Sequence, residues 1–214
     1  MRLNKNKYLL YFIKKIPNKK FFVSKYIQKN YQNKINQYLL NSMETFNYIG
    51  FKLALCLGAN PNIDVNFKEG YHLVTRCARS GDALLLSTLL DFGGDINGGA
   101  YKGGYLPIHM AATKGHANII EILIQRGADI NSIYEIEDQN KNMKRVGWTP
   151  LVCACQENKT DAVLMLLKLG ANHLDKNDLG ISILDIATKF KNRIMIKAIF
   201  DKYEEIPFTP RQKD

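Results

Sequence analysis

The stretch most informative about fold reads Gly104-Tyr-Leu-Pro-Ile-His-Met-Ala-Ala-Thr-Lys-Gly-His116, then Ala117-Asn-Ile-Ile-Glu-Ile-Leu-Ile-Gln-Arg-Gly-Ala-Asp-Ile-Asn131. A short helix is predicted over His109–Lys114, and Gly115 supplies a residue that tolerates the left-handed turn after it. Gly127 is suited to ending a second helix. That second helix is predicted from apolar residues at helical spacing, namely Ile119, Ile120, Leu123 and Ile124.

Two phrases of this stretch recur along the chain. The phrase at Gly127 has variants whose opening glycines are 35, 34 and 43 residues apart, at Gly58, Gly93, Gly127 and Gly170. The phrase at Gly104 returns at Gly147, and degenerate copies begin at Gly70 and Gly180. One such unit has too few aliphatic side chains to be stable alone, so the units are expected to stack.

This pattern resembles the ankyrin repeat, whose motif runs Gly-x-Thr-Pro-Leu-His-x-Ala-Ala, Gly-His and Leu-Leu-x-x-Gly-Ala-Asp-x-Asn. The resemblance implies an all-α solenoid of stacked helix-turn-helix units with short hairpin fingers. It divides the chain into a basic and aromatic N-terminal segment (1–36), an ankyrin-repeat domain (37–203) and a C-terminal tail (204–214). Within the domain it implies a partial repeat followed by four full ones, the last a cap, at 37–64, 65–97, 98–131, 132–174 and 175–203.

Several residues depart from the family pattern. Leu106 and His72 replace the threonine that caps the first helix, and each lost cap costs about 1 kcal/mol. Thr75 and Val152 stand where the family has histidine. The spacing of 43 indicates an insertion within 132–145, which is predicted to form an extended, mobile finger.

No residue set in the sequence predicts catalysis, a cofactor or a metal. His109 and His116 occupy structural positions of the family motif. The Cys153-Ala-Cys155 pair has no further ligands at zinc spacing, and the four cysteines are expected to be reduced. Residues 98–104 are rich in glycine but lack the order of a phosphate-binding loop. The protein is therefore predicted not to be an enzyme.

A candidate binding surface comes from the residue after each opening glycine. It is large and apolar in all four full repeats: Tyr71, Tyr105, Trp148 and Ile181. In ankyrin domains this position lies on the finger side of the concave face, and aromatic residues are enriched at interfaces. Two interpretations stand, ligand binding and packing on neighbouring hairpins. The inner-helix residues Arg79, Lys114, Glu157 and Lys189 would flank the row with mixed charge, which disfavours nucleic acid as its ligand.

The formal charge of +10 is unevenly spread. Residues 1–43 hold ten basic residues and no acid, whereas residues 44–214 hold twenty of each sign. Three interpretations of the segment 1–36 stand. It is a flank of the first repeat whose amino-acid composition reflects an AT-rich genome, or it makes weak contact with an anionic membrane, or it binds nucleic acid.

The function implied by the resemblance is non-catalytic protein–protein binding through the concave face. A small ankyrin protein of AT-rich composition resembles those of intracellular bacteria or large DNA viruses, and this resemblance implies a host protein as partner. An endogenous scaffold or inhibitor subunit is equally compatible. The expected location is the cytoplasm, or a host cell reached by non-classical secretion. The alternative is an adaptor that uses the basic segment on a membrane surface or nucleic acid.

Overall fold

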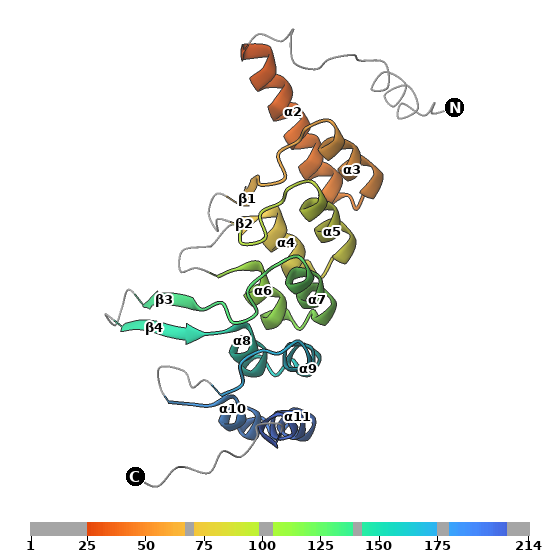
Figure 1. Ribbon diagram of the computed structural model, residues 1–214. Coiled ribbons are helices and arrows are strands. Elements are labelled where there is room, and N and C mark those ends of the chain that lie inside the picture. Colours follow the sequence, from red (N-terminus) through yellow and green to blue (C-terminus); the bar gives the residue numbers. More distant parts are fainter. Residues whose placement is uncertain (1–24, 67–70, 99–104, 139–142, 175–179, 205–214) are drawn as a thin grey trace.

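The computed structural model describes the backbone of residues 25–66, 71–98, 105–138, 143–174 and 180–204. In these residues the helices form five helix-turn-helix pairs stacked in one row (Figure 1). The pairs are α2 (Lys25–Glu44) with α3 (Tyr48–Cys56), α4 (Leu73–Ser80) with α5 (Ala83–Asp91), α6 (Pro107–Lys114) with α7 (Ala117–Gln125), α8 (Pro150–Gln156) with α9 (Thr160–Lys168), and α10 (Ile183–Lys189) with α11 (Arg193–Glu204).

The stack has an inner and an outer layer of helices. The inner helices α4, α6, α8 and α10 contact one another in sequence order, and so do the outer helices α3, α5, α7, α9 and α11. Aliphatic side chains between the layers are fully buried in every pair, among them Leu39, Leu86, Ile120, Leu166 and Ile199. The predicted all-α solenoid is confirmed.

Within the described ranges, two antiparallel hairpins project from the inner side of the stack as fingers (Figure 1). One pairs β1 (Asp64–Asn66) with β2 (Tyr71–His72), and the other pairs β3 (Tyr134–Asp138) with β4 (Met143–Trp148). The segment predicted as an inserted finger folds as the second hairpin, in which Asp138 lies opposite Met143. The mobility predicted for the inserted finger stays a prediction, and the tip at 139–142 lies outside the described residues.

The N-terminal boundary predicted at residue 37 falls inside α2. Ile35 lies before that boundary, yet its side chain is buried in the core together with Leu39 and Met43. The unit that was expected to be partial therefore contains two helices. The boundary was predicted too late because this segment is rich in polar residues. Those of α2 whose side chains are described lie mostly on the exposed side of the helix, among them Asn30, Asn33, Lys34 and Asn41.

Inner helices α8 and α10 start with side-chain caps, of which the one at Thr149 was predicted. The Thr149 hydroxyl accepts a hydrogen bond from the Val152 amide at 3.4 Å, and Ser182 forms a capping box with Asp185. Helices α4 and α6 begin at His72 and Leu106 without a side-chain cap, as their departure from the motif predicts.

The turns between inner and outer helices adopt a left-handed backbone. Gly81 and Gly115 have φ angles of 78° and 84°, and Asn158 fills the equivalent place at 52°. The end units carry larger residues there, Phe46 and Lys191, each with a φ of 53°. A left-handed phenylalanine is unusual because its Cβ crowds the backbone.

Side-chain hydrogen bonds join neighbouring units along the finger side. Asn62 accepts from the Asp95 amide at 2.7 Å and donates to the Gly93 carbonyl at 3.1 Å. Asn131 accepts from the Asn172 amide at 2.8 Å. These bonds fix the spacing of successive fingers.

Candidate protein-binding site

The four residues predicted to bind a partner occupy one repeat position. Each directly precedes the N-cap residue of an inner helix, where a finger joins that helix. Since α4, α6, α8 and α10 contact one another in order, the position recurs once per unit along the stack. We call this set the finger-base row: Tyr71, Tyr105, Trp148 and Ile181.

Tyr105 lies along its own helix. Its ring centroid is 5.7 Å from that of His109, at an angle of 45°, and its hydroxyl is hydrogen-bonded to that of Thr113. The side chain is half-buried. Tyr105 therefore contributes to packing within its unit, as one of the two interpretations requires, while part of its surface faces outward.

The other members of the row differ in exposure. Trp148 ends β4, is half-buried, and packs against the hydrophobic core. Ile181 is 37% exposed. The backbone of Tyr71 lies in β2 opposite Asn66, and its side chain lies outside the described residues. The described members thus run from core-packed to solvent-exposed along the stack.

The flanking charged residues are all exposed near the ends of inner helices. Arg79 and Lys189 share one repeat position, and Lys114 and Glu157 share the next. In α6 and α8 the position of Arg79 is taken by Thr113 and Gln156, both half-buried and both missed as site residues. The repeat spacing alone could have identified them, because each follows its opening glycine by nine residues.

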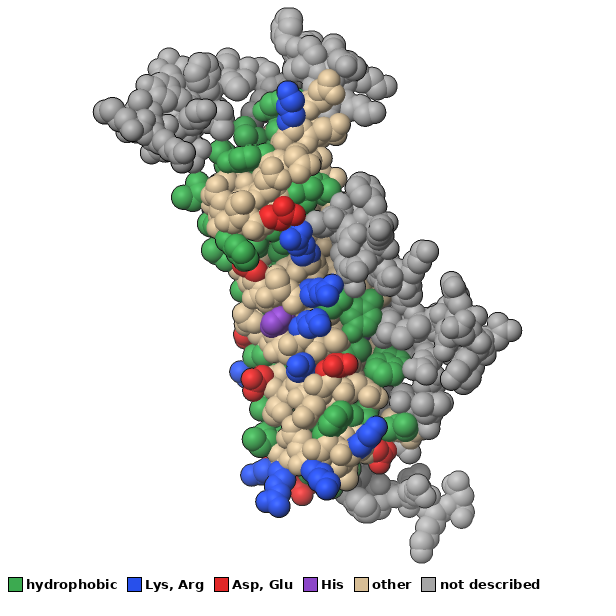
Figure 2. All heavy atoms as spheres, turned by 180° about the vertical axis from the view of Figure 1, so that it is seen from behind, with side chains coloured by type: hydrophobic (Ala, Val, Ile, Leu, Met, Phe, Trp, Pro, Cys, Tyr) green, Lys and Arg blue, Asp and Glu red, His purple; other side chains and the backbone are tan. Residues whose placement is uncertain are grey.

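The charge of the stack is mixed in sign. Arg76 on α4 lies 3.8 Å from Glu44 on α2, between side chains that are 37% and 60% exposed. Figure 2 shows lysine and arginine side chains interspersed with acidic ones along one face. A ligand for this surface would therefore need complementary charges of both signs.

His109 is fully buried and connects its helix to the next finger. Its Nε2 donates a hydrogen bond to the Ser132 carbonyl at 3.0 Å. Burial lowers the pKa of His109 to about 4, although the backbone hydrogen bonds of Ser132 and Trp148 partly oppose this shift. The side chain is therefore neutral at neutral pH and serves as a hydrogen-bond donor.

The cysteines are free thiols, as predicted. Cys56 is exposed and the other three are buried. Burial raises the pKa of Cys77, Cys153 and Cys155 to about 12 in each case. These three side chains are consequently protonated at neutral pH.

Metal-binding clusters and membrane-spanning helices are both absent from the described part of the chain. There, no group of three or more His, Cys, Asp or Glu side chains is placed to hold a metal ion. No helix in these same ranges has the length and hydropathy needed to cross a membrane.

Comparison with known families agrees with the repeat architecture. A model of three ankyrin repeats matches residues 29–134, and a model of a single ankyrin repeat matches residues 146–178. None of the curated proteins compared with the chain matches it. The three-repeat match starts at residue 29, within α2, so it includes most of the helix whose start the sequence analysis did not predict. The two matches together cover more than half of the sequence, and the chain belongs to the ankyrin-repeat family.

Proposed function

We propose that this protein is a non-enzymatic module that binds another protein through the finger-base row and the exposed ends of its inner helices. Ankyrin repeats are in general protein–protein interaction modules. The observation that carries the proposal is the recurrence of a large apolar side chain at one repeat position. Described members of the row retain exposure beside the exposed residues Arg79, Lys114 and Glu157.

The mechanism is recognition by a preformed surface. Hydrogen bonds from Thr75 to the Gly98 carbonyl at 2.8 Å and from His109 to the Ser132 carbonyl at 3.0 Å hold inner helices to the fingers. A surface fixed in this way loses little conformational entropy when a partner binds. Apolar side chains from the row would supply the central contacts, and the charged residues around them would orient the partner.

The nature of the partner follows from the surface chemistry. An apolar row flanked by Arg79, Lys114 and Glu157 suits a protein surface with apolar side chains and charges of both signs. The expected host protein as partner, and the expected cytoplasmic or exported location, stay predictions. The alternative adaptor function rests on the basic segment 1–36, of which residues 1–24 lie outside the described residues, and it too stays a prediction.

Proximity labelling in the native cell would identify candidate partners, and binding of a purified candidate would then be measured by calorimetry. Changing Tyr71, Tyr105 and Trp148 together to alanine should weaken binding by about thirtyfold or more, the effect of losing ~2 kcal/mol at an interface hot spot. A matched double change on the outer helices, Asn118→Ala with Asp161→Ala, should leave affinity unchanged.

Because Tyr105 and Trp148 also pack, a second variant tests the proposal with the fold preserved. Arg79, Lys114 and Ile181 are exposed, so their joint replacement by alanine should keep the circular dichroism spectrum and still reduce affinity. Affinities equal to wild type for both triple variants would overturn the concave-face proposal.

A further inference from the structure

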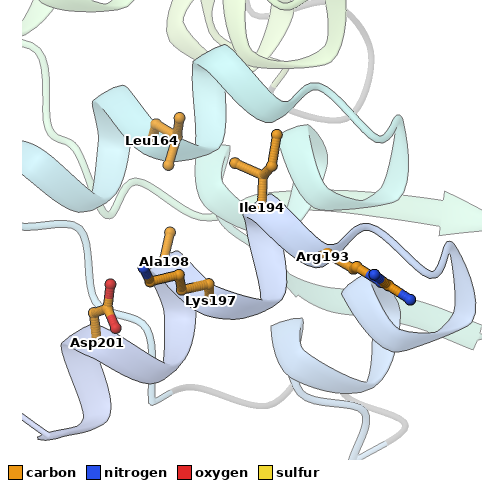
Figure 3. A pocket seen from close by; sticks show the side chains of 6 residues that line it. All are labelled: Leu164, Arg193, Ile194, Lys197, Ala198 and Asp201. Carbon is orange, nitrogen blue, oxygen red and sulfur yellow. The ribbon is translucent and has the colours of Figure 1, made fainter.

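A groove of about 410 Å³ lies between the last two outer helices, α9 and α11. Figure 3 shows Leu164 on α9 facing Ile194 and Ala198 on α11 across this space. Leu164 is 38% exposed and Ile194 is 65% exposed. We call this feature the terminal groove, and its lining residues are Leu164, Arg193, Ile194, Lys197, Ala198 and Asp201.

The other units provide an internal comparison, since the outer helices α3, α5, α7, α9 and α11 contact one another in order and each has residues equivalent in helix position to Leu164 or Ile194. Leu164 is the fifth residue of α9, and Ile194 is the second residue of α11. Every other described junction has at least one polar residue at these positions. The equivalent pairs are Lys52 with Leu84, Ser87 with Asn118, and Glu121 with Asp161.

The apolar character of Leu164 and Ile194 is not explained by the stacking of the outer helices. The three other junctions stack with at least one polar side chain at these positions, so stacking does not require both Leu164 and Ile194 to be apolar. Exposing two aliphatic side chains to water has an unfavourable hydration free energy that a bound apolar group would remove. The exposed pair therefore indicates a surface suited to a partner.

The charge around the groove indicates which charges a partner should carry. Arg193 and Lys197 are exposed one helical turn apart on α11, and Asp201 follows after a further turn. Lys191 is also exposed, in the turn just before α11. The groove thus has an apolar floor and an excess of positive charge along one edge, which complements carboxylates beside an apolar ligand face.

We propose that the terminal groove is a second docking surface, which takes an amphipathic helix of another protein bearing aliphatic side chains on one face and carboxylates beside them. A helix laid in a groove between two helices inserts side chains at intervals of three and four residues. Here the aliphatic side chains contact Leu164, Ile194 and Ala198, and the carboxylates pair with Arg193 and Lys197. The surface lies on outer helices, away from the finger-base row, so one chain would link two partners.

The test uses the full chain and two synthetic helical peptides. Both peptides carry leucines at the same helical spacing, and the flanking residues are glutamates in one and lysines in the other. In NMR titrations, the acidic peptide should shift resonances of Leu164, Ile194 and Ala198, and the basic peptide should bind about tenfold more weakly or not at all. Arg193→Glu combined with Lys197→Glu should reverse this preference.

Two further variants locate the interaction. Ile194→Asp should weaken binding of the acidic peptide by about tenfold or more. Asn118→Asp places the same side chain at the equivalent exposed position of α7 and should leave binding unchanged. Circular dichroism checks that both variants keep their helical content.

Three results would overturn the proposal. One is the absence of shifts at the groove residues with the acidic peptide at millimolar concentration. Another is equal affinity for the two peptides. The third is concentration-dependent self-association of the chain alone that Ile194→Asp abolishes, which would make a second copy the occupant.

Discussion

The Nε2 atom of His109 lies 3.0 Å from the Ser132 carbonyl oxygen, and this contact joins inner helix α6 to the start of the following finger. Thr75 holds the same position in α4, where its hydroxyl donates to the Gly98 carbonyl at 2.8 Å. Both side chains are fully buried. The histidine and the threonine therefore perform the same structural task, but only the histidine titrates.

The buried histidine predicts that stability falls in mild acid. Its pKa is about 4 in the folded protein and about 6.5 in the unfolded chain. Its contribution is thus fully present above pH 6.5 and is lost as the pH falls toward 4, because the unfolded state takes up a proton that the folded state does not. The total loss is on the order of 3 kcal/mol.

Urea unfolding at several pH values between 7.5 and 4 measures this loss. His109→Gln keeps a neutral donor and cannot titrate, so its free energy of unfolding should change less over the same window. The difference between the two curves isolates the histidine from the carboxylates. Parallel curves for wild type and variant would contradict the assignment.

The left-handed phenylalanine predicts a stabilising substitution. Phe46 has a φ of 53°, and its side chain is 86% exposed, so the ring gains little from packing. Glycine adopts this backbone without steric cost, so Phe46→Gly should raise the free energy of unfolding by about 1 kcal/mol.

Gly127→Ala is the matched opposite of that substitution. Gly127 has a φ of 95°, and a Cβ placed there would meet no other atom within 4 Å, so the backbone conformation alone opposes the change. It should lower the free energy of unfolding by about 1 kcal/mol. Thermal or urea unfolding measures both, and a destabilised Phe46→Gly would show that the ring has a packing role.

Burial of three thiols predicts a simple pattern of chemical reactivity. With the pKa of Cys77, Cys153 and Cys155 raised to about 12, these side chains hold almost no reactive thiolate at pH 8. An aromatic disulfide reagent should therefore titrate one thiol rapidly, Cys56, and the other three only as fast as the protein unfolds. Cys56→Ser should remove the rapid phase, and a second fast thiol in wild type would reveal local opening of a buried helix.

The sequence was sufficient to predict the fold because the residues that start and end its helices act locally. Glycine after helix ends recurs with the repeat, proline starts α6 and α8, and Thr149 caps α8. Each of these residues acts through the backbone of its own unit. The start of α2 was missed, although Ile35, Leu39 and Met43 recur at a spacing of four and are all buried. The ten basic residues within 1–43 give this segment a strongly basic composition. Composition does not reveal which face of a helix is buried.

The candidate sites were predictable only in part. Repeat spacing predicts that Tyr105, Trp148 and Ile181 share a position, but it cannot show that the Tyr105 hydroxyl is bonded to Thr113. In the sequence, Leu164 is one of several apolar residues close together, with Val163, Leu166 and Leu167. Only the packing of α9 against α11 shows that it faces outward.

The contrast between Tyr105 and Ile181 separates packing from recognition. Tyr105→Phe removes the hydroxyl bonded to Thr113 and keeps the ring, so it should lower the free energy of unfolding by about 1 kcal/mol and leave partner affinity within about twofold. Ile181→Ala truncates a side chain that is 37% exposed, so it should change stability by less than about 1 kcal/mol and weaken binding several-fold. Urea unfolding and calorimetry on the same samples measure both quantities. If Ile181→Ala lowered stability strongly and left affinity intact, the finger-base row would be a packing feature at that unit, because a side chain that only packs affects the fold and not the partner.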